Sequence, residues 1–199
     1  MLVSYAFKGI ILPAMRRIRL TLQYDGSAYS GWQIQPSGMT IQGMIQDAIG
    51  RLTGEDANVI GAGRTDSGVH AIEQVAAFDT DSGLDASVIK RALNAMLPRD
   101  IRVMDAREAG GDFHPRYSAR SKRYSYVIAN MEDVPVFFQR YVWQIMPPLD
   151  IEAMKAASSC LAGTHDFSSF RGAGCGAKNP VRDVLNIEIE EVNGASFLL

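Results

Sequence analysis

Hydrophobic and polar residues alternate near the start of the chain. From Arg17 to Tyr24 every second residue is apolar or aromatic, namely Ile18, Leu20, Leu22 and Tyr24. Because successive side chains of a strand point to opposite faces, this alternation predicts a half-buried strand. The next residues, 25–37, are rich in Gly, Ser, Tyr and Trp, and we predict a loop there.

Two amphipathic helices are predicted in the first half of the chain. One begins after Thr40 and ends at Gly54, and the other begins after Asp85 and ends before Pro98. Thr and Asp are favoured just before a helix, whereas Gly and Pro are common just after one. Short apolar runs predict the remaining strands at 58–60, 74–78 and 101–104.

The predicted order is therefore strand, helix, strand, strand, helix, strand. This order is typical of the split βαβ, or ferredoxin-like, arrangement, in which helices cover one face of a mostly antiparallel sheet. We predict an α+β fold class. Residues 1–15 would be an N-terminal extension, 16–112 an N-terminal α+β domain, and 113–199 a second α+β domain, with the loop 110–118 at the boundary.

The second half is predicted to contain fewer elements. A helix is expected from Asp150 to Gly163 and a loop over 164–180, and strands are expected at 123–128, 141–145 and 184–192. Asn193-Gly194 is a hairpin turn signal, but the chain stops early in the returning strand. We therefore expect this half to be truncated at its C-terminal end.

The composition is that of an ordinary globular protein. Hydrophobic residues make up 47% and charged residues 21%. We find no apolar run long enough to span a bilayer and no secretory signal, so we expect no membrane association. Cys160 and Cys175 form neither a zinc pattern nor a disulfide framework, which favours a reduced, cytoplasmic setting. The net charge of −2 gives no hint of nucleic-acid binding, and the mixed charges of residues 99–123 fit a solvated surface as well as a phosphate-binding face.

The loop 61–71 concentrates chemically unusual residues. Its three glycines allow sharp turns and close approach of a ligand to the backbone. Arg64 and Asp66 are two positions apart, so an extended backbone would direct both to one face. A neighbouring arginine favours the ionised carboxylate, which would suit Asp66 to attack a carbon or to remove a proton. A glycine turn with a surface ion pair is the simpler alternative, but the density of such residues favours a functional loop.

Five segments resemble, in order, the motifs of the tRNA pseudouridine synthase A (TruA) family. Gly63–Ala71, which reads GRTDSGVHA, looks like its active-site motif. The other resembling segments are YDGSAYSGWQ at 24–33, DFHPRYSA at 112–119, KRYSY at 122–126 and GTHDFSSFR at 163–171. The resemblance extends from about residue 16 to residue 199, and an ordered set of this kind is not expected by chance.

The resemblance implies a fold, an activity and partners. The fold would consist of two ferredoxin-like halves packed side by side around a central RNA-binding cleft. The protein would be a homodimeric isomerase that converts uridine to pseudouridine in the anticodon stem-loop of tRNA. Asp66 matches the family's catalytic aspartate, and Tyr124 matches the tyrosine used against the target base. Arg64 would orient Asp66 and help to hold the displaced nucleotide.

The implied reaction sets modest chemical requirements. It breaks the C1′–N1 bond of uridine, rotates the uracil and joins C1′ to C5. Because no oxidation, hydrolysis or phosphate chemistry occurs, we expect neither a cofactor nor a metal. One ionised carboxylate beside the sugar and a water-poor pocket would suffice. The sequence leaves open whether Asp66 attacks C1′, adds to C6 or removes the C2′ proton, and which uridines react.

Several other residues have two possible roles, one in RNA binding and one that is only structural. A stacked uridine must be flipped out before Asp66 reaches its sugar, so we expect a positively lined RNA surface. Candidate phosphate contacts, any one of which alone is more often a plain surface residue, are Lys122, Arg123, Arg171, Lys178 and Arg182. Aromatic residues that either stack on bases or pack in the core are Trp32, Phe167 and Phe170. The three histidines lack metal-ligand spacing, so we expect no metal; they are His70, His114 and His165.

Two other classes of protein compete with this interpretation. A dinucleotide-binding oxidoreductase would explain Gly61-x-Gly63 after a strand, but Asp66 occupies the place of the third glycine and would repel a pyrophosphate. A non-catalytic RNA-binding module is also possible for this element order, although its aromatic strand signature is absent. A catalytically silent piece of a synthase is the stronger form of this second alternative.

Overall fold

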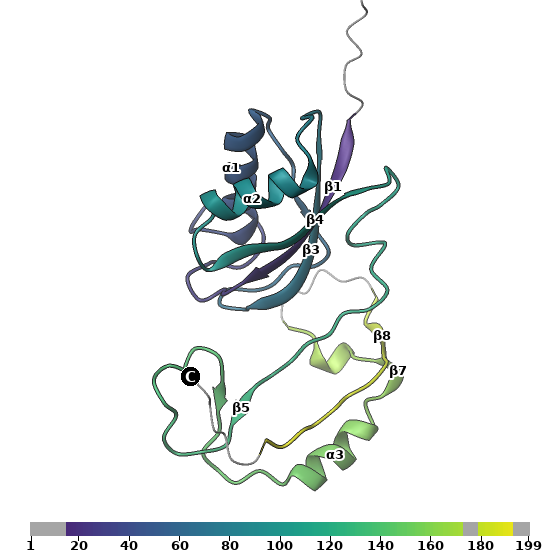
Figure 1. Ribbon diagram of the computed structural model, residues 1–199. Helices are drawn as coiled ribbons and strands as arrows, with labels where there is room; N and C mark the ends of the chain where they lie inside the picture. Colours follow the sequence, from purple (N-terminus) through teal and green to yellow (C-terminus); the bar gives the residue numbers. More distant parts are fainter. Residues whose placement is uncertain (1–14, 173–178, 193–199) are drawn as a thin grey trace, which may run out of the picture. The chain divides into compact units, whose positions relative to one another are not determined.

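A computed structural model describes residues 15–172 and 179–192 (Figure 1). The chain divides into two compact units, residues 1–124 and 125–199. The predicted N-terminal extension, apart from Met15, lies outside the described residues. So do Cys175, Lys178 and the Asn193-Gly194 turn.

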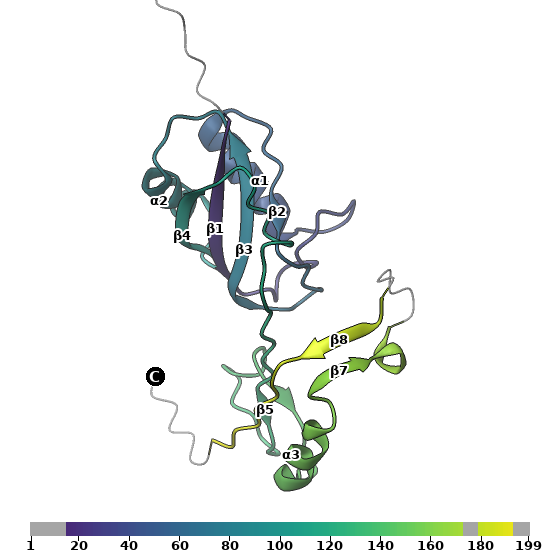
Figure 2. The ribbon, with the colours of Figure 1, turned by 90° about the vertical axis from the view of Figure 1, so that its right-hand side faces the viewer.

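The first unit is built on a four-stranded antiparallel sheet. Its strands are β1 (Arg16–Tyr24), β2 (Ile60–Gly61), β3 (Ala71–Thr80) and β4 (Ile101–Ala109). They lie in the order β2-β3-β1-β4, with every neighbouring pair antiparallel (Figure 2). The element order predicted for this half is confirmed, and β3 and β4 are longer than predicted.

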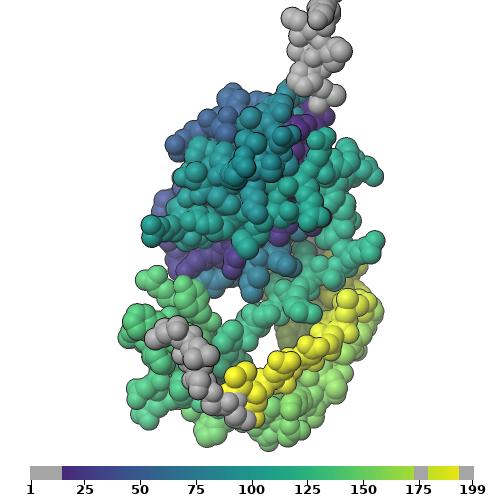
Figure 3. Space-filling view, in the orientation of Figure 1, coloured from purple at the N-terminus to yellow at the C-terminus, as the bar shows by residue number. Residues whose placement is uncertain are grey.

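Both helices of the first unit cover the same face of this sheet (Figure 2). They are α1 (Ile41–Thr53) and α2 (Ala86–Met96). Alternate residues of β1 pack beneath them, and the unit forms one closely filled body (Figure 3). Burial of each large apolar side chain contributes about 1.5–3 kcal/mol. Fully buried members of this core include Ile18, Leu20, Leu22, Ile41, Ile45, Ile49, Ile89 and Leu93.

The helix ends follow from the residues that the sequence places there. The Thr40 hydroxyl accepts a hydrogen bond of 3.2 Å from the backbone N–H of Gly43, which satisfies one free donor of α1. Gly54 ends α1 in the left-handed region, at φ 76°. Asp85 also precedes its helix as predicted, but its side chain makes no capping hydrogen bond.

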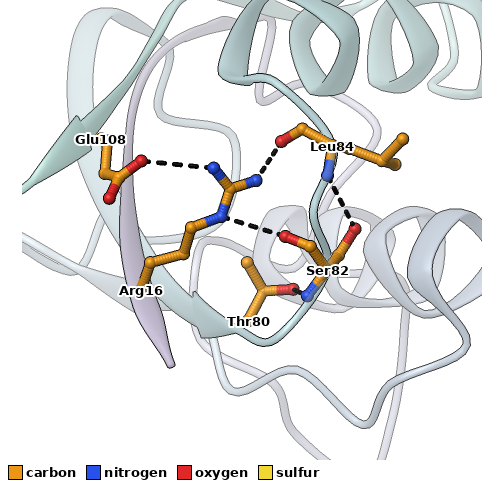
Figure 4. A network of polar contacts seen from close by, with 5 residues as sticks. All are labelled: Arg16, Thr80, Ser82, Leu84 and Glu108. Atoms are coloured by element: carbon orange, nitrogen blue, oxygen red, sulfur yellow. Dashed lines mark hydrogen bonds and ion pairs between the residues drawn. The ribbon is translucent and has the colours of Figure 1, made fainter. Parts of the chain in front are cut away.

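Arg16 joins three parts of the first unit through one guanidinium group (Figure 4). Its Nη1 lies 3.2 Å from a carboxylate oxygen of Glu108 on β4. Its Nε donates to the carbonyl of Ser82 at 3.0 Å, and its Nη2 donates to the carbonyl of Leu84. The start of β1 is therefore tied both to β4 and to the connection between β3 and α2.

The second unit contains short elements and little core. Its strands are β5 (Ile128–Ala129), β6 (Trp143–Gln144), β7 (Gly163–Asp166) and β8 (Val181–Val184), with α3 (Ile151–Ser159) and a 3₁₀ turn η1 (Ser168–Phe170). β5 pairs with β6 in parallel, whereas β7 pairs with β8 antiparallel. Among the described residues of this unit only Val134 is a buried apolar residue, and α3 buries none.

Several predictions for the second half are wrong. Only the last residue of the predicted strand 123–128 belongs to a strand, and of 184–192 only Val184 does. The predicted loop 164–180 instead contains most of β7 and all of η1. Residues 123–127 are exposed, with Tyr124 at 77% and Tyr126 at 80%. Strand propensity largely reflects packing against neighbouring strands, and among the described residues only the end of this run, at Ile128, pairs with another strand, β6.

A bidentate ion pair connects β1 to β3. Arg17 donates from Nε and Nη2 to the two carboxylate oxygens of Asp79, at 2.7 and 2.8 Å. Its Nη1 also donates to the carbonyls of Gly111 and Phe113, so the segment after β4 is held against β1. The hydrogen bond from Arg17 holds the pKa of Asp79 below its ordinary value, although burial acts in the opposite direction.

We predict that Asp79→Asn lowers the free energy of unfolding in a pH-dependent way. Because the folded pKa is depressed, the stabilisation by the pair is complete above the unfolded pKa of about 3.9 and is lost as the pH falls through the folded pKa. Urea unfolding of parent and variant from about pH 7 to about pH 2 measures this difference.

The matched control is Asp47→Asn, because Asp47 forms a looser, exposed pair with Arg51 at 3.8 Å. This control should change stability little at any pH. A stability difference for Asp79→Asn that persists undiminished at the acid end contradicts the assignment.

Candidate active site

The loop between β2 and β3 carries the residues singled out by the sequence, and its base is fixed to β3. The backbone N–H of Ala62 donates to the carbonyl of Val75 at 2.8 Å. The side-chain amide of Gln74 donates to the carbonyl of Gly63 at 2.6 Å. The loop therefore leaves the sheet from a defined starting point.

Thr65 points into the protein and is held on both its side chain and its backbone. Its hydroxyl lies 2.9 Å from the hydroxyl of Tyr24, and its carbonyl accepts from the N–H of Trp32 at 2.9 Å. Tyr24 and Trp32 are 3% and 2% exposed. Burial raises the pKa of Tyr24, so its hydroxyl stays protonated and can hydrogen-bond. The flanking residues Arg64 and Asp66 are both exposed, as expected when side chains alternate.

A tight turn follows the carboxylate residue. The N–H of Val69 donates to the carbonyl of Asp66 at 3.2 Å, which closes a four-residue turn. Gly68 occupies the third position with φ 79°, a left-handed conformation that glycine adopts without steric cost. The turn fixes the backbone on the C-terminal side of Asp66.

The loop 25–38 packs against this turn backbone to backbone. A Cβ added at Gly26 would lie 2.0 Å from the carbonyl oxygen of Val69. One added at Gly31 would lie 2.6 Å from the carbonyl oxygen of Thr65, and Gly31 also has a φ of 91°. Atoms of a larger residue cannot approach so closely, so these two glycines permit the contact between the loops.

His70 adds a polar contact between the same two loops. Its Nδ1 lies 3.0 Å from a carboxylate oxygen of Asp25 and 3.2 Å from the N–H of Gly26.

The other two histidines also have local partners. The ring of His114 lies 4.4 Å from that of Tyr117, and His165 Nε2 lies 2.7 Å from the carbonyl of Ala162. In residues 15–172 and 179–192 no three metal-binding side chains cluster.

The structure shows where each predicted site residue lies but does not bring all of them together. Arg64 and Asp66 are both exposed on the loop, and no ion pair within 4 Å joins them among the described residues. Both side chains extend into solvent, where such a pair gains little. Tyr124 is 77% exposed, and in the described part of the chain no hydrogen bond joins it to Asp66.

Lys122 lies closer to the loop than its position in the sequence indicates. Its Nζ is 3.0 Å from the place where a Cβ at Gly63 would be. The absence of a side chain at Gly63 therefore leaves room for an ammonium group next to Arg64. Lys122 thus adds a positive charge to this loop beside Gly63, and positive side chains bind the phosphate groups of nucleic acids.

Sequence reasoning did not identify the residues that hold this loop. Alternation predicts Tyr24 as a strand residue, and the family resemblance includes it in the segment 24–33, but neither predicts its hydrogen bond to Thr65. Alternation does predict that Tyr24 lies on the buried face of β1, together with Ile18, Leu20 and Leu22. Trp32 follows the core-packing alternative: its ring lies 6.2 Å from that of Tyr24, and its atoms touch Gly61.

Comparisons with known proteins identify the class. Residues 21–118 and 157–198 match the family model of tRNA pseudouridine synthase. The chain is 45% identical over 177 residues to tRNA pseudouridine synthase A of Thermoanaerobacter sp. (strain X514), covering 89% of this chain and 72% of that protein. It is 43% identical over 180 residues to the enzyme of the same name from Myxococcus xanthus, covering 90% of this chain and 68% of the relative. For the Caldicellulosiruptor bescii enzyme the identity is 48% over 172 residues, 86% of this chain and 70% of the relative.

The matches, together with the carboxylate loop that they include, define an isomerase that acts on uridine in tRNA. The chain belongs to the tRNA pseudouridine synthase A (TruA) family. Among the described residues, no helix has the length and apolar character needed to cross a membrane.

We predict that Gly26→Ala lowers the rate of pseudouridine formation about 100-fold while the secondary structure persists. The added methyl group collides with the backbone at Val69 and shifts the turn at residues 66–69, and a displacement of about 1 Å within an active site has an effect of this size. The rate is measured by tritium release from tRNA that carries 5-tritiated uridine, because formation of the C1′–C5 bond expels this tritium. Circular dichroism measures the secondary structure.

Gly83→Ala is the matched control, because Gly83 has no positive φ and no heavy atom lies within 4 Å of the place that an added Cβ would occupy. It should leave the rate unchanged. Equal rates for Gly26→Ala and Gly83→Ala would contradict the role of the loop contact.

Proposed function

We propose that Asp66 is the catalytic carboxylate of this tRNA-uridine isomerase, acting as nucleophile or base. The observation that carries this proposal is the fixed backbone around an exposed side chain. Thr65 is locked inward, the turn at 66–69 is closed, and Asp66 remains available to a substrate. A group held in this way before substrate binds loses little entropy at the moment of reaction.

The proposed chemistry uses only groups of the protein and the substrate. The C1′–N1 bond breaks, the uracil rotates, and a C1′–C5 bond forms; C5 loses its hydrogen as a proton, and N1 takes up a proton, so substrate and product have the same composition. Asp66 attacks C1′, adds to C6 or removes the C2′ proton, and in each scheme it must be ionised. No electrons are exchanged with an outside partner, so we propose a reaction without cofactor or metal.

The proposed substrate is a uridine of the anticodon stem-loop, flipped out of its stack. Arg64 would hold the displaced nucleotide and orient Asp66 once RNA excludes solvent and strengthens their attraction. Tyr124 would stack on the target base and donate its hydroxyl hydrogen bond. The exposure of both side chains leaves them free to meet RNA, which supports these roles.

The proposed architecture is two ferredoxin-like halves around an RNA-binding cleft. The strand order and antiparallel pairing of the first unit support this arrangement for residues 16–112, with 113–199 as the second domain. We further propose a homodimer, since one tRNA is large relative to a chain of 199 residues. We also propose that the protein works in the cytoplasm, in keeping with the cysteine pattern.

We predict that Asp66→Asn abolishes isomerisation and leaves tRNA binding nearly intact. The amide matches the carboxylate in size but cannot act as nucleophile or base. Tritium release from tRNA with 5-tritiated uridine reports formation of the C5 bond, and filter binding reports affinity. Replacing the anticodon-stem uridines by cytidine should remove the release.

Asp85→Asn serves as the control, because Asp85 is also exposed and its side chain makes no capping bond. Asp85→Asn should release tritium and bind tRNA as the parent does. Release by Asp66→Asn at the parent rate would refute the assignment of Asp66. tRNA binding without release by the parent itself would instead favour a silent RNA-binding module.

We also predict that Lys122→Gln weakens tRNA binding in a salt-dependent way. If the Lys122 ammonium beside Gly63 contacts a phosphate, its loss should reduce the slope of log affinity against log salt by about 1. Lys155→Gln is the control, since Lys155 pairs with Glu152 on α3 at 2.9 Å. An unchanged slope for Lys122→Gln would exclude the phosphate contact.

A further inference from the structure

Tyr29 lies in the loop 25–38, which packs against the turn at residues 66–69. This turn begins at Asp66 and is called the Asp66 turn below. Its side chain is only 5% exposed, and its hydroxyl donates to a carboxylate oxygen of Asp100 at 2.7 Å. Burial, together with the hydrogen bond and the negative charge of Asp100, raises the pKa of Tyr29, so the hydroxyl remains a donor. Asp100 lies immediately before β4, and its own carbonyl accepts from the N–H of Asp25 at 2.9 Å.

The backbone carbonyl of Tyr29 meets the residues that directly follow Asp66. It accepts from the hydroxyl of Ser67 at 3.2 Å and from the N–H of Gly68 at 3.4 Å. The N–H of Tyr29 donates to the carbonyl of Gly26 at 2.9 Å, which fixes the direction of the peptide. A single residue therefore connects the start of β4, through its side chain, to the Asp66 turn, through its backbone.

The close packing of the loops makes this connection mechanically direct. On one side Gly26 abuts Val69, and on the other Gly31 abuts Thr65, in both cases with no space for a methyl group. Because backbone touches backbone on both sides of Tyr29, a shift of its carbonyl must shift the turn that carries Asp66. The two long hydrogen bonds to Ser67 and Gly68 alone would hold the turn less firmly.

We propose that Tyr29 is a positioning residue for the isomerisation: through its hydrogen bond to Asp100 it holds the backbone that sets the place of the Asp66 carboxylate. This inference rests on the proposed role of Asp66 and adds a residue that touches neither the base nor the sugar. Loss of the Tyr29 hydroxyl should lower the rate at which bound tRNA is isomerised, without weakening the binding of tRNA.

The first test compares Tyr29→Phe with Thr80→Val. Both remove a hydroxyl that donates to a carboxylate, since Thr80 donates to Glu55 at 2.6 Å and is 2% exposed. Thr80 lies at the opposite end of β3 from the loop, where it pairs with Arg16. Tyr29→Phe should lower kcat about 10- to 100-fold with an unchanged KM for tRNA. Thr80→Val should lower stability while leaving kcat at the parent value.

The second test uses two variants of Asp100. One keeps an acceptor for the Tyr29 hydroxyl and the other removes it, so the effect of the hydrogen bond can be distinguished from a general effect on the fold. Asp100→Asn keeps an oxygen acceptor and should retain most of kcat, whereas Asp100→Ala should fall to the level of Tyr29→Phe. The double variant should be no slower than either single one, because both remove the same bond. If Tyr29→Phe does not fold, the two Asp100 variants carry the test.

Hydrogen exchange supplies a readout that does not require activity. The amides of Trp32 and Gly68, which bond across the two loops, should exchange faster in Tyr29→Phe and Asp100→Ala but not in Thr80→Val. Unchanged exchange, or a kcat for Tyr29→Phe equal to that of Thr80→Val, would overturn the proposal. If the parent released no tritium, the proposed function would fail, while faster exchange at these amides would still establish the connection between the loops.

Discussion

The inward position of Thr65 is the constraint on which the rest of the site depends. Its hydroxyl contacts Tyr24 on the buried face of β1, and its carbonyl receives the N–H of Trp32. With Thr65 fixed to the core, alternation places Arg64 and Asp66 on the solvent side. A carboxylate that would otherwise belong to a surface turn is thereby tied to the most buried part of the first unit.

Glycine makes this arrangement sterically possible. Gly26 and Gly31 let one loop lie directly on the other, and Gly68 accepts the left-handed conformation that closes the turn. The helix-covered sheet below supplies the rigidity, with α1 and α2 burying one face of β1. The scaffold and the close backbone contact together hold the backbone on both sides of the exposed Asp66 carboxylate.

Sequence periodicity predicted the first unit well because its residues pack as their pattern requires. Ile18, Leu20 and Leu22 alternate and are fully buried, and Thr40 and Gly54 end α1 by local hydrogen bonding and backbone conformation. The strand predicted at 123–128 is wrong over residues 123–127, because alternation alone does not supply a partner strand; in the described part of the chain only Ile128 pairs, with β6. The unusual residues of the loop 61–71 predict a candidate site, but the hydrogen bond between Tyr29 and Asp100 joins residues far apart in the chain, which no local pattern reveals.

The most direct test of this account is the hydrogen exchange of two amides, those of Trp32 and Val69, in the free protein and in its complex with tRNA. These N–H groups bond to the carbonyls of Thr65 and Asp66. A loop that is already in place before substrate binds predicts strong protection of both amides in the free protein and little change on binding. Rapid exchange in the free protein, with protection only in the complex, would show that tRNA builds the site and would contradict the account.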